Sequence, residues 1–154
     1  MIIRRVWIEW DHDQTSDARD LGAYSDTPGP DAIDQQEHGV IVPLRIRYFT
    51  PALTAEQTGN PDSPMQDYLR AEAFNRGDLY FESCRAAAEV QSRDGGVIQR
   101  IKSGGLYGIE SDSGKAYFTE VEDEELATLA NELASFGFDA SDVGVAISNA
   151  ESRR

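Results

Sequence analysis

The stretch DLYFESCRAAAEVQSRDGGVIQRIKS, residues 78–103, decides the fold. Its first half is typical of a β-strand, and it is followed by Asp94-Gly95, a dipeptide that strongly predicts a hairpin turn. We therefore expect residues 79–92 to pair antiparallel with residues 96–103. Consecutive strands joined in this way indicate an antiparallel sheet.

Further strands and helices flank this hairpin. Residues 2–10, IIRRVWIEW, are β-branched and aromatic and predict a strand with Val6, Ile8 and Trp10 on its core face. Residues 40–51 predict a second strand, and one or two short strands with a turn at residues 111–114 follow the hairpin. Capping residues and apolar spacing predict helices that begin at Ser63, at Thr119 and behind Asp139.

This order of elements predicts an α+β fold. The expected architecture is an antiparallel sheet of about four to five strands, with two to three helices packed on one face. Because one sheet needs all of these strands, we expect a single domain over residues 1–154. Residues 11–40 would form a long loop, and residues 139–154 a short helix followed by a frayed tail.

Charge is the most unusual feature of the composition. The chain carries 28 acidic and 14 basic residues, a formal net charge of −14, and half of this excess lies in residues 120–154. Nucleic acids and anionic lipid surfaces should repel such a chain, so direct nucleic-acid binding and membrane binding are disfavoured. A basic protein is the partner that this charge favours. The alternative that the acidity serves only solubility or a salty cytoplasm stays open.

Several kinds of catalytic and metal site are disfavoured. Asp11, His12 and Asp13 could converge on a metal in a loop, but the spacing that follows them fails the EF-hand pattern. Cys84, the one cysteine, is predicted to be a packed thiol, and a chain with one thiol and no export signal suits the cytoplasm. We therefore assign no catalytic residues and predict neither a cofactor nor a metal.

A glycine-rich segment, SGGLYGIESDSG, occupies residues 103–114. It lacks the residue order and the strand–helix context of a phosphate-binding loop. Gly104, Gly105 and Gly108 are typical of places where a sheet bends or another backbone approaches, and Ser111–Gly114 is typical of a turn. The alternative is a recognition patch built around Tyr107.

Residues 98–138, IQRIKSGGLYGIESDSGKAYFTEVEDEELATLANELASFGF, resemble a segment of uncharacterised proteins of bacteriophages, prophages and plasmids. RYFTP at residues 47–51 and QDYLRAEAFNRGDLYF at residues 66–81 are also similar to that family. Tyr107 stands where those relatives usually have tryptophan. The resemblance extends over roughly residues 45–140 and implies an accessory protein of a mobile element, acting in a bacterial cytoplasm. It implies no catalytic residues.

Together these observations favour a non-enzymatic acidic binding protein whose partner is a basic host protein. One concrete version is an antagonist of a host defence protein that binds nucleic acid, of the anti-CRISPR or anti-restriction type, with a surface that mimics DNA. Two alternatives stay open: a small metal-assisted hydrolase that uses carboxylates near Asp11 and Asp13, and a structural or assembly accessory protein. The oligomeric state is left open. The residues predicted to contact the partner are Glu120, Glu122, Asp123, Glu124, Glu125, Tyr107 and Asp112.

Overall fold

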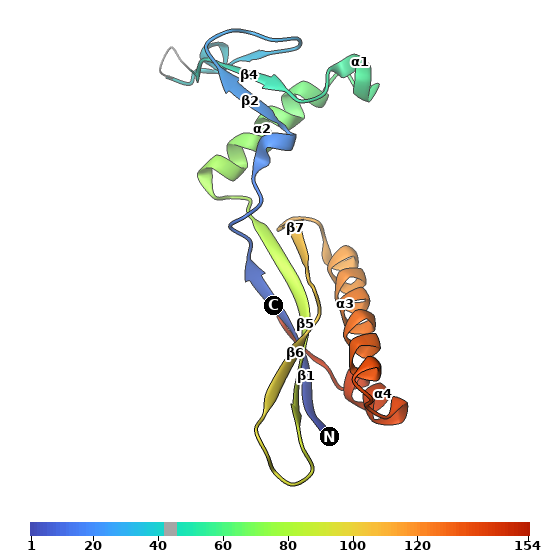
Figure 1. Cartoon of the computed structure of the whole chain (residues 1–154). Helices are drawn as coiled ribbons and strands as arrows, with labels where there is room; N and C mark the ends of the chain where they lie inside the picture. Colours follow the sequence, from blue (N-terminus) through green and yellow to red (C-terminus); the bar gives the residue numbers. More distant parts are fainter. Residues whose placement is uncertain (42–45) are drawn as a thin grey trace. The chain divides into compact units, whose positions relative to one another are not determined.

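The computed structural model describes residues 1–41 and 46–154, so part of the strand expected at residues 40–51 lies outside the described residues. The chain divides into two compact units, whose elements are drawn in Figure 1. Unit 1 consists of Met1–Ser16 and Phe81–Arg154, and unit 2 of Asp17–Tyr80. The expectation of a single domain stays a prediction. Within the described residues, every helix is too short or too polar to cross a membrane.

Unit 1 is built on a five-stranded sheet, and the predicted α+β fold is confirmed. Strands β6, β5, β1 and β8 lie side by side in that order, and β7 pairs with β5. All pairs are antiparallel except β1 with β8, which run parallel. The strands are β1 (Ile2–His12), β5 (Phe81–Gln91), β6 (Gln99–Lys102), β7 (Leu106–Glu110) and β8 (Glu151–Arg153).

The hairpin predicted from Asp94-Gly95 is confirmed, although the loop that joins its strands is longer than two residues. β5 pairs antiparallel with β6, and residues 92–98 join them. Gly95 has a φ of 84°, and its N–H donates to the carbonyl of Ser92 at 3.1 Å. The left-handed conformation at Gly95 therefore closes the turn, as the sequence predicts.

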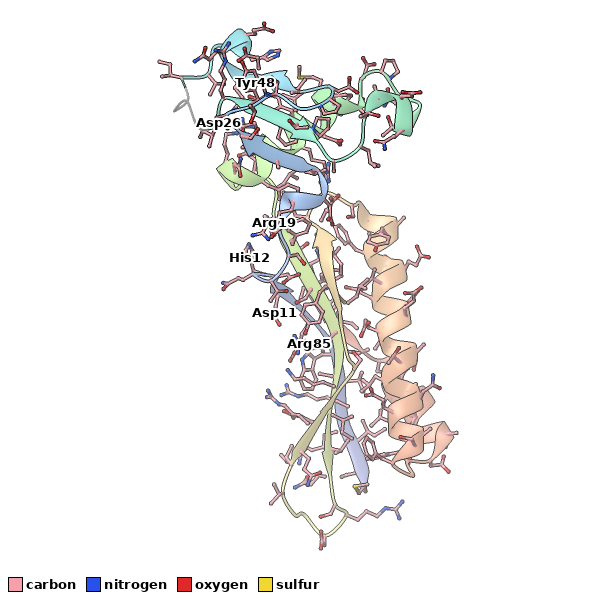
Figure 2. The ribbon with its side chains drawn as sticks, turned by 45° about the horizontal axis from the view of Figure 1, so that its top comes forward. Asp11, His12, Arg19, Asp26, Tyr48 and Arg85 are labelled. Carbon is pink, nitrogen blue, oxygen red and sulfur yellow. The ribbon has the colours of Figure 1, made fainter. Side chains whose placement is uncertain are left out.

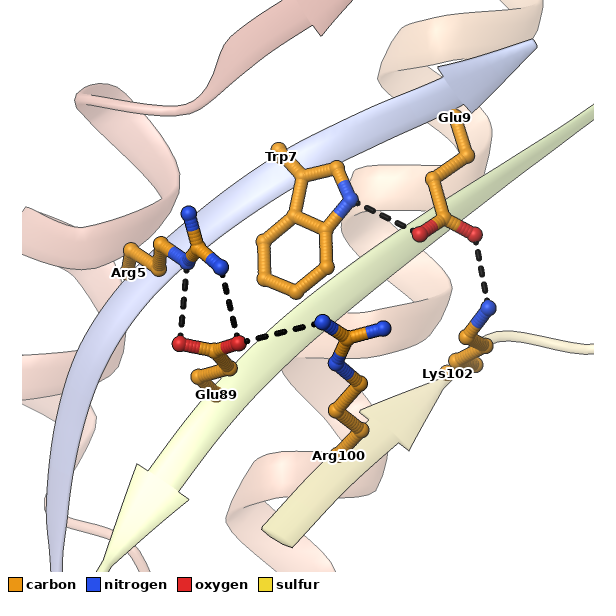
Figure 3. A network of polar contacts seen from close by, with 6 residues as sticks. All are labelled: Arg5, Trp7, Glu9, Glu89, Arg100 and Lys102. Atoms are coloured by element: carbon orange, nitrogen blue, oxygen red, sulfur yellow. Dashed lines mark hydrogen bonds and ion pairs between the residues drawn. The ribbon is translucent and has the colours of Figure 1, made fainter. Parts of the chain in front are cut away.

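The pairing of β1 with β5 sorts the side chains of β1 onto two faces. Val6 and Ile8 are buried in the main core, as predicted, whereas Trp7 lies on the opposite face of the sheet (Figure 3). The register shifts between Ile3 and Arg5, which indicates a bulge. Ile3 consequently packs against the same core as Val6, where unbroken alternation would have placed it on the other face.

Two helices, α3 (Lys115–Ser135) and α4 (Ala140–Ser148), cover one face of this sheet (Figure 1). α3 begins four residues before the predicted cap at Thr119, whose hydroxyl donates instead to the carbonyl of Lys115 inside the helix. Phe118, which is buried in the core, lies in this added first turn. The predicted acidic residues of α3 therefore lie beyond its first turn, where the helix dipole stabilises carboxylates less.

The end of unit 1 is more ordered than expected. Asp139 caps α4 as predicted, because its carboxylate accepts a hydrogen bond from the backbone N–H of Ser141 at 2.8 Å. The segment expected to be a frayed tail instead forms β8, which pairs with β1 at Trp7–Glu9. This pairing gives the backbone of β8 hydrogen-bond partners that a free tail would find only in water.

Unit 2 contains a three-stranded sheet in the order β2-β4-β3. Phe49, Tyr68 and Ala71 form its buried cluster. Its helix predicted to begin at Ser63 is present, with Asp62 rather than Ser63 at the N-cap position. The elements are two 3-10 helices (Ala18–Asp20 and Gln35–His38), β2 (Gly22–Ser25), β3 (Ile33–Asp34), β4 (Tyr48–Pro51), α1 (Ala55–Thr58) and α2 (Ser63–Arg76).

The long loop expected over residues 11–40 therefore contains regular structure. The two short strands and two 3-10 helices of unit 2 that precede residue 40 all lie in this segment. Tyr24 of β2 donates a hydrogen bond from its hydroxyl to Glu72 of α2 at 2.5 Å, which ties the segment to the helix. Strands of two to four residues leave too few alternating positions for a period-2 pattern to be recognised in the sequence.

Two phenylalanines at the end of α3 provide a test of the core. Phe136, which directly follows α3, is 58% exposed, whereas Phe138 is 8% exposed and belongs to the core. We expect Phe138→Ala to lower the free energy of unfolding by about 3–5 kcal/mol, because it leaves a cavity. Phe136→Ala is the matched control and should cost less than about 1 kcal/mol. Urea denaturation followed by circular dichroism measures both, and equal losses would contradict this placement of the core.

Candidate partner-binding surface

The five predicted acidic residues of α3 divide into two groups. Glu120, Asp123 and Glu124 are exposed to solvent, and none of them has an ion-pair partner among the described residues. Their positions, i, i+3 and i+4, make them neighbours on one side of the helix, with about 5–6 Å between Cβ atoms. We call these three residues the acidic patch of α3.

Glu122 and Glu125 are partly buried and turn toward the sheet. One carboxylate oxygen of Glu122 accepts hydrogen bonds from Trp10 Nε1 at 2.7 Å and from Ser152 Oγ at 2.6 Å. Glu125 accepts a hydrogen bond from the hydroxyl of Ser103. Through these hydrogen bonds both residues tie α3 to the strands. Their role in the fold could not be recognised from the spacing of acids along the helix.

Three basic residues of unit 1, Arg5, Arg100 and Lys102, gather on the face of the sheet that the helices leave uncovered (Figure 3). Arg154 instead lies over the rings of Trp10 and Phe118 and pairs with Glu82, and Lys115 begins α3. Arg5 donates two hydrogen bonds to Glu89, at 2.8 and 2.9 Å, and Arg100 lies 3.4 Å from the same carboxylate. The hydrogen bonds from Arg5 hold the pKa of Glu89 below its usual value. Lys102 pairs with Glu9 at 2.7 Å. These cations are thus matched by carboxylates of their own face and leave the acidic patch uncompensated.

Trp7 is the centre of this network. Trp7 is 1% exposed, and among the described residues the guanidinium groups of Arg5 and Arg100 lie over its ring. The distances from the ring centroid are 4.8 Å to Arg5 and 5.5 Å to Arg100. Its Nε1 donates to Glu9 at 2.9 Å. Cation–π contacts and buried apolar area therefore stabilise a tryptophan on the uncovered face of the sheet.

Tyr107 and Asp112 are not brought together with the acidic patch into one site. Tyr107, on β7, is 48% exposed and accepts a hydrogen bond from Arg85 at 3.2 Å. Arg85 alternates along β5 with the core residues Cys84 and Ala86, so it lies on the face opposite the helices. Asp112 is exposed in the turn that precedes α3. The partner contacts predicted for Tyr107 and Asp112 stay predictions.

Two of the three glycines predicted to allow a bend or a close backbone approach do so, whereas a Cβ added at Gly104 would meet nothing within 4 Å. Gly105 and Gly108 have φ values of 83° and 72°. A Cβ added at Gly105 would lie 3.2 Å from the backbone oxygen of Cys84, on the neighbouring strand. Positive φ and this close approach both require glycine. The turn predicted at Ser111–Gly114 is also present: the N–H of Ser113 donates to the carbonyl of Glu110 at 3.0 Å, and α3 begins directly after the turn.

Asp13, in the N-terminal part of unit 1, holds the glycine-rich segment in place through a hydrogen bond to Gly108. Its side chain is 5% exposed, and one oxygen accepts from the N–H and the hydroxyl of Thr15, at 2.8 and 2.6 Å. The other oxygen accepts from Ser16 Oγ at 2.6 Å and from the N–H of Gly108 at 2.9 Å. Hydrogen bonds from Ser16 and Thr15 hold the pKa of Asp13 well below its usual range.

The residues considered for metal binding and for nucleophilic chemistry are exposed, bound by protein donors or buried. Asp11 and His12 are exposed at the end of β1 (Figure 2), whereas both oxygens of Asp13 are occupied by protein donors. In the part of the chain that the structure describes, no group of three or more His, Cys, Asp or Glu residues could hold a metal ion. Cys84 is fully buried, and burial raises the pKa of its thiol to about 12, which is unfavourable for a nucleophile.

Comparison of the chain with models of protein families, with curated proteins and with solved structures finds no match.

Replacement of Asp13 tests its role as an anchor. In Asp13→Asn an amide NH2 group replaces one carboxylate oxygen. Whichever oxygen it replaces, the NH2 group faces a backbone N–H, of Thr15 or of Gly108, that donates to Asp13 in the wild type. We expect a loss of about 1–3 kcal/mol in the free energy of unfolding at pH 7. Asp11→Asn, an exposed residue two positions away, removes the same charge and should cost less than about 0.5 kcal/mol.

The pH dependence of the free energy of unfolding, compared between the wild type and Asp13→Asn, gives an independent measurement. The pKa of Asp13 is lower in the folded chain than the value of about 3.9 expected when it is unfolded. Its stabilisation is therefore complete above that value and is lost as the pH falls through the folded-state pKa. The stability gap between the wild type and Asp13→Asn should narrow on acidification. A stability gap that widens on acidification, or equal stability of Asp13→Asn and Asp11→Asn at pH 7, would contradict the role of Asp13 as an anchor.

Proposed function

We propose that the protein is a non-enzymatic binding protein of a phage or other mobile element, whose acidic patch on α3 engages a basic surface of a host protein in the bacterial cytoplasm. The proposed partner is a defence protein that binds nucleic acid, which the acidic surface would antagonise by occupying its basic groove. The resemblance of residues 98–138 to proteins of phages, prophages and plasmids motivates the mobile-element context.

The observation that carries the proposal is the separation of charge between the two sides of the sheet in unit 1. Arg5, Arg100 and Lys102 pair with carboxylates of the uncovered face. On the other side, α3 presents Glu120, Asp123 and Glu124 without an ion-pair partner among the described residues. The helix thus displays neighbouring carboxylates that no described residue neutralises in an ion pair.

Such a surface is suited to a partner that normally binds phosphates. Carboxylates on a helix and phosphates along a nucleic acid are both rows of negative charge, and a basic groove attracts either of them. The net charge of −14 increases the rate of encounter with a basic protein and decreases it for nucleic acid itself. Acidity that served only solubility would not require these residues to lie on one side of one helix.

The proposal is tested by affinity capture from a bacterial lysate in which nucleic acid has been digested. The immobilised full-length protein should retain a basic nucleic-acid-binding protein at about 50 mM NaCl and release most of it at about 500 mM, since salt screens exposed charges. Added duplex DNA should compete with the immobilised protein for the captured partner. Capture that is independent of salt, or that DNA does not affect, would contradict the proposal.

A variant in which the acidic patch is neutralised tests whether this patch is the surface that binds the partner. The triple variant Glu120→Gln, Asp123→Asn, Glu124→Gln should bind the captured partner about tenfold more weakly, because three exposed ion pairs contribute together about 1.4 kcal/mol. The control variant Asp26→Asn, Glu37→Gln, Glu56→Gln removes the same net charge from exposed residues of unit 2. Equal weakening by both variants would show that only the total charge of the chain matters.

A further inference from the structure

The edge of β1 that faces β8 is only partly covered. β8 pairs with β1 at Trp7–Glu9 alone, whereas β1 extends from Ile2 to His12. No described strand pairs with Ile2–Val6 on this edge. Five residues of strand, about 17 Å long, thus present backbone donors and acceptors to a partner outside unit 1's own sheet.

A groove of about 630 Å³ lies along this part of β1. One wall is the strand from Ile2 to Trp7, and the other is α4, through Asp142, Val145 and Ala146. Figure 1 shows the beginning of β1 and α4 near each other at the same end of unit 1. The volume lies within the range of about 300–1,000 Å³ that is typical of ligand pockets.

We propose that this groove, which we call the β1–α4 groove, binds an extended peptide segment of a partner protein. The segment would pair with Ile2–Val6 as an added strand, in line with β8. Its side chains that face α4 would be apolar and basic. This inference does not depend on the acidic patch of α3 being a binding surface.

An extended peptide is the ligand that the geometry of the groove favours. An unpaired strand edge binds another backbone through the same hydrogen bonds that join strands within a sheet, and adjacent pockets select alternate side chains. Val145 is 63% exposed on the wall of the groove, although the neighbouring residues of α4, Val143 and Ala146, pack against the core. An apolar side chain of the added strand would cover Val145.

The charges of the groove favour basic side chains on the α4 side. Asp142 and Glu151 both line the groove, and no ion pair within 4.0 Å joins either of them to a described residue, although the charge of Glu151 helps to raise the pKa of Arg5. The two cations of the groove have partners: Arg5 is held by Glu89, and Arg4 donates to the side-chain oxygen of Gln91 at 2.6 Å. A basic segment is also the kind that a chain of net charge −14 attracts.

A second copy of the chain is a poor occupant of this groove. Antiparallel pairing of two identical edges centred on Ile2–Val6 places the Arg4 side chains of the two copies opposite each other, which is destabilising. The bulge between Ile3 and Arg5 further hinders the pairing of identical edges. Two chains that each carry a charge of −14 also repel one another.

The test uses a display library of random linear peptides, selected on the full-length protein. Enriched sequences should be rich in apolar and basic residues without a helical period, and adding one of them should slow amide hydrogen exchange at Ile2–Val6. Val145→Glu should weaken binding at least about tenfold, since it places a charge in the apolar part of the groove. Val97→Glu is the control, because Val97 is 82% exposed in the connection between β5 and β6.

A second pair of variants tests the role of charge and separates this inference from the proposed function. Asp142→Asn should weaken the selected basic peptides several-fold, whereas Asp123→Asn in the acidic patch should leave their binding unchanged. The inference is overturned if no peptide is enriched, if enriched peptides bind without protecting Ile2–Val6, or if the protein covers this edge by dimerising. Each of these results leaves the capture experiment on the acidic patch unaffected.

Discussion

The antiparallel pairing of β1 with β5 is the constraint on which unit 1 depends. It joins two strands of eleven residues whose paired positions are up to about ninety residues apart in the chain, and every other strand of the sheet is added to one of these two. Because strand side chains alternate, the pairing creates two faces with different chemistry. Val6, Ile8 and Cys84 meet the helices on one face, while Trp7 and its arginines occupy the other.

The same pairing separates the charges of unit 1. Arg5, Arg100 and Lys102 lie close enough to Glu9 and Glu89 for ion pairing, so their charge is largely compensated within the uncovered face. The acids of α3 lie on the far side of the core, where Glu122 and Glu125 orient the helix and the acidic patch faces solvent. A helix held by two of its own carboxylates presents the three carboxylates of the acidic patch in a fixed arrangement, which is what recognition of a basic surface requires.

Local signals were sufficient to predict the hairpin, the turn at residues 111–114, the cap at Asp139 and the α+β class. Interactions between distant residues were not predictable in this way. The hydrogen bond from Gly108 to Asp13 spans 95 positions, and the burial of Trp7 depends on Arg100 of another strand. The start of α3 was misplaced because the burial of Phe118 extends the helix beyond a good capping residue. Propensity is a weak prior that tertiary packing overrides.

The separation of charge is tested most directly by carbodiimide labelling of the folded protein's carboxylates, with the rate at each residue measured by mass spectrometry and normalised to the unfolded chain. We predict fast labelling at Glu120, Asp123 and Glu124, and strong protection at Asp13 and Glu89, whose oxygens are bound by protein donors. Labelling of Asp13 and Glu89 as fast as that of the three helix residues would contradict the account.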